Sequence, residues 1–418
     1  MKFETISVVG LGYIGLPTAA VIASNGIRVV GVDVNQHAVD TINQGMIHIV
    51  EPGLEDLVKR AVNDGHLTAH TSPQKADAFL IAVPTPFKGE EHEPDLKYIE
   101  SASRALAPML EKGNLVVLES TSPVGATEQM AKWLAEERSD LTFPHTVVEG
   151  QTPDIFVAHC PERVLPGQVI RELVENDRII GGMDEASTAA ATQVYKMFVK
   201  KGECIATSAR TAEMSKLTEN AFRDVNIAFA NELSLICDQQ GINVWELISL
   251  ANRHPRVNIL QPGCGVGGHC IAVDPWFIVN QNPETAKMIR QARLVNDYKP
   301  QYVVEQVEKA VAGISNPKIA CLGLAFKPDI DDLRESPALD ITKTLANNVN
   351  YKILAVEPNI ELLPSTLKNC DNVNLASLSD ALQQADIIVI LVKHTQFLGL
   401  NNSDIKNVVV LDFVNSVQ

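Results

Sequence analysis

The sequence predicts an α/β protein in which two α/β units flank an all-helical middle. Short β-branched runs alternate with helical patterns over the first 200 residues, which is typical of a parallel, doubly wound sheet. One long helical pattern without Pro or Gly follows from Thr211 to Gln240, and strand-like runs return after residue 317. At roughly 150 residues per domain, the length allows two or three domains.

The first unit is expected to contain five strands separated mostly by helices. The helical patterns include Gly15–Asn25 and His37–Ile42, where apolar residues recur at helical spacing. The expected strands are Thr5–Gly10, Arg28–Asp33, Ala78–Val83, Leu115–Ser120 and Thr146–Ala158.

Helices are expected in the middle of the chain and strands in its last part. Gly241 ends the long helical pattern, and further helices are expected over Val244–Ala251 and Glu284–Gly313. The last unit is expected to contain the strands Lys318–Gly323, Lys352–Val356, Ala385–Val392 and Val408–Asp412. We therefore expect domains at 1–200, 201–313 and 314–418.

Composition excludes several classes of protein. The formal net charge of −16 argues against a general binder of nucleic acid or anionic membrane, because like charges repel. The sequence contains no run of 18 apolar residues, so no membrane span is expected. The seven cysteines are odd in number and form no CxxC pair, so no zinc site or disulfide framework is expected and a reducing cytoplasm fits.

A glycine-rich turn follows the first expected strand. Gly10 allows a tight turn, Gly12 lets the backbone approach a pyrophosphate, and Gly15 lets the next helix pack closely. Asp33 ends the next strand, where its carboxylate can accept a hydrogen bond from a ribose 2′-hydroxyl and would repel a 2′-phosphate. The pattern predicts NAD rather than NADP; the alternative is a strand–turn–helix without a ligand.

Two later strands of this unit end in threonine-bearing turns. Thr85 lies in Val-Pro-Thr-Pro and Thr121 in Glu-Ser-Thr-Ser-Pro-Val-Gly. The carboxyl ends of such strands face the ligand crevice, so both hydroxyls are expected near the cofactor. The alternative is that these are only turns that end strands.

Cys270 lies in a loop rich in Gly and Pro. Five of the residues between positions 262 and 268 are Gly or Pro, so the backbone can approach a ligand closely. His269 is adjacent, and Asp274 is within reach if a helical turn begins at Cys270. A small buried residue is the ordinary state of a cysteine, and we expect it for Cys264, Cys237 and Cys321. The polar setting instead favours Cys270 as a nucleophile.

Other polar residues form candidate substrate contacts. Lys216, Asn220 and Arg223 are spaced to share one face of the long helix, which could equally be an ordinary solvated face. Glu162 lies between Pro161 and Pro166, so a rigid turn presents it; the alternative is a loop ion pair. Cations recur in other Pro-bearing turns, which suggests a phosphate-bearing ligand in a chain that is otherwise acidic.

Taken together, these segments resemble the nucleotide-sugar 6-dehydrogenase family. In chain order they are GLGYIGLP, VPTP, ESTSPVG, the Pro-Glu-Arg turn, Lys-x-x-x-Asn-x-x-Arg, GVGGHC and FKPDIDDLRESPA, which span nearly the whole chain. The resemblance implies two Rossmann-like domains joined by a long central helix, with NAD bound by the first and the UDP-sugar by the last. It also implies a homodimer or larger homo-oligomer formed through the central helix.

The resemblance further implies a four-electron oxidation of a sugar alcohol to an acid at C6. Cys270 is then the nucleophile, which forms a thiohemiacetal and later a thioester that water cleaves. Lys216 is implied to act as a general acid/base or to stabilise the negative oxygen at C6, and Asn220 completes this polarising pair. Glu162 and Asp274 are implied to manage protons and the attacking water, which Thr121 holds.

The family's contacts can be carried over to matching positions. The implied NAD contacts are Tyr13, Ile14, Asp33, Thr85, Thr121 and Arg334. The implied nucleotide-sugar contacts, besides Lys216 and Asn220, are Arg163, Val164, Arg223, His254, Arg256, Gly267 and Lys327.

Two local segments also indicate which nucleotide sugar is the substrate. The segment Gly-His-Cys-Ile-x-Val-Asp-Pro resembles the N-acetylhexosamine branch, and His-Pro-Arg-Val-Asn-Ile-Leu-Gln-Pro-Gly implies UDP-N-acetyl-D-mannosamine and a role in bacterial surface-polysaccharide synthesis. UDP-N-acetyl-D-glucosamine is the nearest alternative substrate. A non-catalytic regulator that binds NAD and a UDP-sugar would predict loss of the thiol or the lysine, and both are present. A two-electron hydroxyacid dehydrogenase would need no cysteine.

Overall fold

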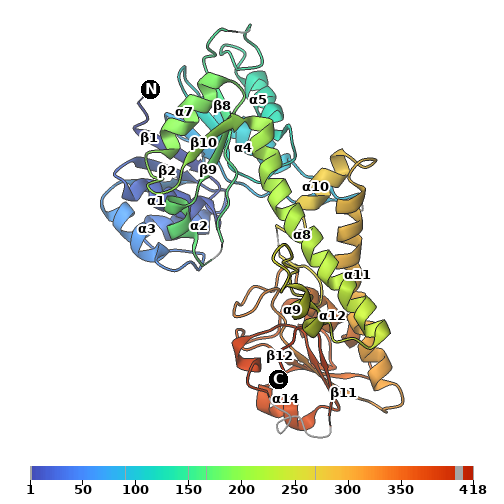
Figure 1. The fold of residues 1–418 in the computed structure, drawn as a ribbon. Coiled ribbons are helices and arrows are strands. Elements are labelled where there is room, and N and C mark those ends of the chain that lie inside the picture. Colours follow the sequence, from blue (N-terminus) through green and yellow to red (C-terminus); the bar gives the residue numbers. More distant parts are fainter. Residues whose placement is uncertain are drawn as a thin grey trace. The chain divides into compact units, whose positions relative to one another are not determined.

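The computed structural model describes residues 2–89, 91–148, 150–165, 167–268, 270–400 and 408–417. By their internal packing the residues fall into two compact units, 1–218 and 219–418, each described here by itself. The long helix α8 (Ala209–Gln240) runs across the boundary and is labelled in Figure 1. Among the described helices, none is long and apolar enough to cross a membrane.

The first unit is built on an eight-stranded sheet. Its strand order is β10-β9-β8-β7-β4-β1-β2-β3, so the order reverses between β1 and β4. The strands are β1 (Thr5–Val9), β2 (Arg28–Val32), β3 (Leu67–His70), β4 (Ala78–Ile81), β7 (Leu115–Leu118), β8 (Phe156–His159), β9 (Arg178–Gly182) and β10 (Cys204–Ser208). A small hairpin, β5 (Phe87–Lys88) and β6 (Glu93–Pro94), stands apart from this sheet.

Helices cover both faces of this sheet. Alternate residues of β1 enter different cores, with Ile6 and Val8 in one and Val9 in the other, as expected for a strand buried on both faces. The helical elements are α1 (Gly15–Ser24), α2 (Gln36–Asn43), α3 (Leu54–Asn63), α4 (Lys97–Leu106), η1 (Ala107–Met109), α5 (Ala126–Glu137), α6 (Val169–Glu175) and α7 (Glu185–Tyr195).

The first unit differs from the sequence prediction in several features, and its strands β3, β9 and β10 were not expected. Only the end of Thr146–Ala158 is a strand. The chain forms turns before it, where Thr146 N–H donates to Phe143 O, and Thr142 and Asp154 exchange hydrogen bonds. The sheet is also not wholly parallel, since β9 pairs antiparallel with β8. The doubly wound α/β class is nevertheless confirmed.

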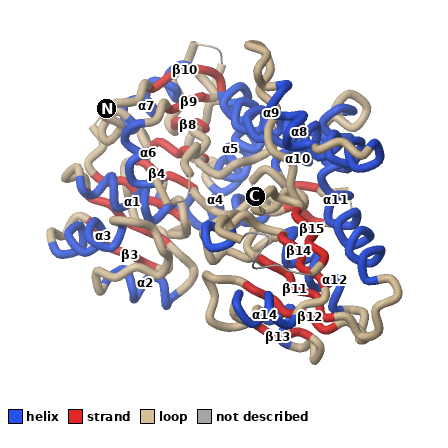
Figure 2. The backbone as a smooth tube through the Cα atoms, turned by 60° about the horizontal axis from the view of Figure 1, so that its bottom comes forward, coloured by secondary structure: helices blue, strands red, loops and turns tan. Residues whose placement is uncertain are grey.

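The second unit begins with helices and ends in a five-stranded parallel sheet. The strand order is β13-β12-β11-β14-β15, with β11 (Lys318–Leu322), β12 (Lys352–Val356), β13 (Val373–Leu375), β14 (Ile387–Ile390) and β15 (Val409–Asp412). Its helical elements are α9 (Val244–Ala251), α10 (Asp274–Gln281), α11 (Lys287–Val311), α12 (Pro337–Ala346), α13 (Ser365–Lys368), α14 (Leu378–Gln384) and η2 (Thr395–Phe397). The strands of both sheets are red in Figure 2.

Candidate active site

The turn after β1 has the shape that a dinucleotide requires. Gly10 has φ +93°, and a Cβ there would lie 2.5 Å from Ala82 O. A Cβ on Gly15 would lie 1.7 Å from Gly10 O, so only glycine lets α1 approach the turn this closely. Around Gly12, by contrast, no atom lies within 4 Å of an added Cβ, which leaves the backbone open to a phosphate group.

Asp33 follows β2 and faces the same turn. Its Oδ2 accepts a hydrogen bond of 2.9 Å from Leu11 N–H, and its Oδ1 accepts one of 2.9 Å from Asn35 N–H. Each carboxylate oxygen can accept a further bond. The residue is half-buried, so the structure holds this carboxylate in a fixed orientation beside the glycine turn.

Thr85 adds an unsatisfied hydroxyl beyond the end of β4. Its Oγ1 is buried and has no hydrogen-bond partner in the described part of the chain, which is costly unless a ligand supplies one. Thr121, beyond β7, is half-buried, as is Ile14, while Tyr13 is 48% exposed. The open Gly12, the fixed Asp33 and the orphaned Thr85 together fit a dinucleotide at the point where the strand order reverses.

Glu162 lies in a buried group of polar side chains in the same unit. Arg178 of β9 donates a 2.6 Å hydrogen bond to its Oε2, and Arg163 N–H donates one of 2.7 Å to its Oε1. The ion-pair alternative is therefore realised through Arg178. The Arg163 guanidinium instead donates to Asp177 O at 3.4 Å, and Val164 is half-buried.

Glu119, which sequence reasoning did not select, belongs to this group. Tyr195 of α7 donates a 2.5 Å hydrogen bond to its Oε1, while Oε2 is buried with no partner among the residues that the structure describes. Burial and the nearby charge of Glu162 raise the pKa of Glu119 to about 7. Glu119 stands directly before Ser120 and Thr121, so the position is recognisable from sequence but its burial is not.

Glu213 of α8 is a second carboxylate that sequence reasoning missed. It accepts hydrogen bonds from Gly125 N–H, Thr127 N–H and Thr127 Oγ1 at 2.6, 2.8 and 2.6 Å. These are groups at the start of α5, where free amides and the helix dipole favour a negative charge. Glu213 thereby fixes the first turns of α8 to the Thr121 turn.

In the second unit, the structure brings Cys270, Asp274 and Asn220 together. Asp274 N–H donates to Cys270 O at 2.9 Å, so a helical turn does begin at Cys270 and leads into α10. Asn220 Nδ2 donates to Asp274 Oδ2 at 2.5 Å, and both side chains are buried. Cys270 itself is exposed, whereas Cys264, Cys237 and Cys321 are buried as expected.

The remaining predicted residues of α8 and the following loop differ in exposure. Lys216 is half-buried, one turn before Asn220 on the same helix, and Arg223 is exposed. His254 and Arg256 are exposed in the loop after α9, where Arg256 N–H donates to His254 Nδ1 at 3.3 Å. His269 and Pro166 lie outside the described residues.

Gly267 packs against the segment that carries Lys327 and Arg334. A Cβ on Gly267 would lie 2.3 Å from Glu335 O and 2.6 Å from Pro337 Cδ. Lys327 is exposed, and Arg334 forms a bidentate ion pair with Asp332 in its own segment. The glycine loop before Cys270 and the Lys327 segment are thus in direct contact.

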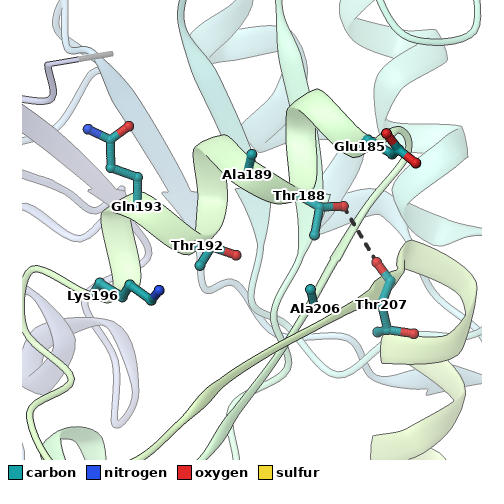
Figure 3. Close-up of a pocket in the computed structure, with 8 residues that line it drawn as sticks. All are labelled: Glu185, Thr188, Ala189, Thr192, Gln193, Lys196, Ala206 and Thr207. Atoms are coloured by element: carbon teal, nitrogen blue, oxygen red, sulfur yellow. Dashed lines mark hydrogen bonds between the residues drawn. The ribbon is translucent and has the colours of Figure 1, made fainter.

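A cavity of about 700 Å³ lies elsewhere on the first unit. It runs along α7 and β10, and Figure 3 shows Lys196 and Gln193 along the helix with Thr207 on the strand. None of the residues predicted from the sequence as site residues lines it. The predicted chemistry therefore does not fall in this cavity.

Comparisons with known proteins agree with the geometry. Residues 4–199, 210–298 and 320–418 match the NAD binding, central and UDP binding domains of the UDP-glucose/GDP-mannose dehydrogenase family. A UDP-N-acetyl-D-mannosamine dehydrogenase from Campylobacter jejuni is 67% identical over 97% of this chain and 98% of its own length. An NDP-N-acetyl-D-galactosaminuronic acid dehydrogenase from Ralstonia solanacearum is 63% identical over 99% of this chain and 96% of its own.

A solved structure of a relative has the same fold. The UDP-D-ManNAc dehydrogenase from Pyrococcus horikoshii aligns with a TM-score of 0.87 at 40% identity, over 99% of this chain and 96% of that one. The family resemblance that the motifs carry is therefore confirmed. The chain belongs to the UDP-glucose/GDP-mannose dehydrogenase family and is an oxidoreductase that uses NAD.

Proposed function

We propose that the enzyme oxidises C6 of UDP-N-acetyl-D-mannosamine to the carboxylate, using two NAD and one water. The observation that carries this proposal is the exposed thiol of Cys270, one turn before α10, beside the buried Asn220–Asp274 pair. The choice of sugar is supported by relatives of that name at 61–67% identity. The uronate product would serve surface-polysaccharide synthesis.

The proposed chemistry uses a covalent bond to Cys270. Two NAD molecules, bound one after the other, would each accept one hydride from C6. After the first hydride leaves, the Cys270 thiolate adds to the aldehyde carbon and gives a thiohemiacetal. Loss of the second hydride leaves a thioester, which water cleaves to the acid and the free thiol. Covalent capture keeps the aldehyde from escaping between the two oxidations.

Other side chains are proposed to hold charge and protons during these steps. Lys216 and Asn220 would stabilise the negative oxygen at C6. Asp274 and Glu162 would accept protons and, with Thr121, orient the attacking water. Asn220 is already oriented by its bond to Asp274, and Glu162 by its bonds to Arg178 and Arg163 N–H.

We also propose a homo-oligomer, a homodimer at its smallest, formed through α8. Phe222, Phe229 and Ile236 recur every seven residues along this helix and are 68%, 54% and 41% exposed. A row of apolar side chains at this spacing is typical of a helix that packs against another. A solution mass equal to the 45.5 kDa of one chain would contradict the assembly.

The test of the activity is NADH release across a panel of nucleotide sugars. The panel contains UDP-N-acetylmannosamine, UDP-N-acetylglucosamine, UDP-N-acetylgalactosamine, UDP-glucose and GDP-mannose. The galactosamine sugar is included because the Ralstonia relative is named for that configuration. We expect two NADH per sugar, with UDP-N-acetylmannosamine the best substrate; a yield of one would contradict the four-electron reaction.

The variant Cys270→Ser tests whether the thiol takes part in the reaction. The variant should form no acid and should bind NAD as the unsubstituted enzyme does, because the glycine turn and Asp33 lie in the other unit. Undiminished turnover by this variant would refute the role of the thiol.

A further inference from the structure

The sheet of the second unit repeats the strand–turn arrangement that forms the cofactor turn of the first. Gly323 follows β11 with φ +95°, as Gly10 follows β1 with φ +93°. Each donates its N–H to the last residue of the neighbouring strand, Val356 O and Val32 O, at 2.8 Å. Leu324 N–H donates to the Glu357 carboxylate at 2.8 Å, as Leu11 N–H donates to Asp33 at 2.9 Å.

The two turns differ in what fills the space in front of them. In the first unit, Thr85 lies two residues after Val83 and its hydroxyl has no partner among the described residues. In the second unit, His394 lies two residues after Val392, is fully buried, and has its Nε2 3.0 Å from Glu357 Oε2. The second unit therefore has a buried, hydrogen-bonded ring at the position where the first has an unpaired hydroxyl.

His394 connects the sheet to the segment that carries Lys327. Asp329 N–H donates to His394 Nδ1 at 2.9 Å, and Asn359 Nδ2 lies 3.3 Å from the same nitrogen. With donors facing Nδ1, the ring proton is assigned to Nε2, which then donates to Glu357. The ring thus bridges Glu357, anchored at the strand ends, and the backbone of Asp329.

Asp329 is held in a backbone conformation that needs support. Its φ is +60°, a value that is uncommon for a residue other than glycine. Thr395 N–H and Oγ1 donate to its two carboxylate oxygens at 2.8 and 2.7 Å. Lys327, two residues earlier, is exposed, so the Asp329 bonds fix the base of the segment that presents it.

The same segment supports the loop before Cys270. A Cβ on Gly268 would lie 2.9 Å from the ring of Phe326, and Gly268 N–H donates to Glu335 O at 3.3 Å. Phe326 N–H in turn donates to Asp332 O at 3.2 Å. A shift of the Lys327 segment would therefore reach both the nucleotide contact and the Cys270 loop.

We propose that His394 is a positioning residue for nucleotide binding, which acts by holding Asp329 and with it the Lys327 segment. The proposal rests on the proposed function, in which the second unit binds the UDP part of the substrate. The bond that matters is the one from Asp329 N–H to Nδ1, because it is the ring's link to the segment. The bond from Nε2 to Glu357 orients the ring.

Two substitutions separate these bonds. In His394→Asn the amide oxygen can take the place of Nδ1 and accept from Asp329 N–H, whereas in His394→Gln the amide nitrogen can take the place of Nε2 and donate to Glu357. The probes are UDP alone and NAD alone, measured by titration calorimetry, together with KM and kcat for the nucleotide sugar.

We expect His394→Gln to weaken UDP binding and raise the KM for the nucleotide sugar by about five- to tenfold, the value of one lost hydrogen bond. NAD affinity should change less than UDP affinity, because Arg334 is the one assigned NAD contact on this segment, and kcat should change less than KM. His394→Asn should stay close to the unsubstituted enzyme. Equal losses in both variants, no loss in either, or a loss confined to kcat would overturn the proposal.

Thr395→Val keeps the proposal testable if His394→Gln unfolds. This substitution removes only the Oγ1 bond to Asp329 and leaves the ring in place. A larger loss of UDP binding than of NAD binding supports the proposal, and unchanged UDP binding overturns it. If the unsubstituted enzyme fails to bind UDP, the proposed function fails, and this inference fails with it.

Discussion

Glu119 shows how one buried side chain affects stability. Burial raises the pKa of the Glu119 carboxyl from its usual 4.5 to about 7, so the folded protein holds this proton at pH values where the unfolded chain has released it. Between these values the unfolded state binds fewer protons, so the free energy of unfolding falls as pH rises. A shift of this size corresponds to about 3 kcal/mol, lost progressively across that window.

Glu119→Gln should remove this loss. The amide oxygen can still accept from Tyr195, and no charge forms at high pH. We expect the variant to have a higher thermal midpoint than the unsubstituted enzyme at pH 8 and a smaller advantage at pH 5. Glu128→Gln is the matched control, because a hydrogen bond from Arg210 lowers the pKa of Glu128 and its removal should bring no gain at pH 8. An equal gain in both variants would contradict the argument.

At the scale of residues, a site residue can be predicted from the sequence when its partners are close to it along the chain. Gly10, Gly15 and Asp33 could be selected because the turn that needs them is local and its spacing is specific. The burial of Glu119 could not be predicted, because its partner Tyr195 is 76 residues away and only the folded sheet brings them together. The same is true of Glu213, which reaches Thr127 over 86 residues.

At the scale of elements, buried strands and the long helix were the easiest to predict. Ala78–Ile81 and Leu115–Leu118 are short apolar runs, and the absence of Pro and Gly marks the whole of α8. β9 was not predicted, because Arg178–Gly182 has a charged start and a Gly-Gly end, and its antiparallel pairing with β8 depends on tertiary contacts.

The loop before Cys270 gives a prediction at the same scale. Gly267→Ala places a Cβ 2.3 Å from Glu335 O, so this loop or the Lys327 segment must move. We expect at least about a tenfold loss of kcat/KM, since small displacements of a nucleophile are costly, while NAD affinity stays unchanged. Gly263→Ala is the matched control, because no atom lies within 4 Å of its Cβ. Equal activity of the two variants would show that the close packing does not matter.

At the scale of the whole molecule, the two units repeat one plan with different outcomes. Both sheets reverse their strand order beside a glycine turn and an acidic residue, which is why alternating strands and helices in the sequence predicted an α/β unit at each end. The sequence did not predict that Thr85 Oγ1 lacks a partner among the described residues, whereas the corresponding position of the second unit holds the buried side chain of His394. That difference depends on side-chain contacts between the ends of separate strands.

Because each unit carries its own turn, the two ligands should be separable by mutation. Asp33→Asn removes a carboxylate that can accept from a ribose hydroxyl, so NAD affinity should fall by about tenfold, as for a lost charge-assisted bond, while UDP affinity stays unchanged. Lys327→Ala should do the reverse, because the cation stands on a segment of the second unit. Titration calorimetry with NAD and with UDP on both variants tests this. If either substitution weakened both ligands equally, the assignment of Asp33 to NAD and of Lys327 to UDP would be wrong, since in that case the side chain would act through the stability of the chain as a whole.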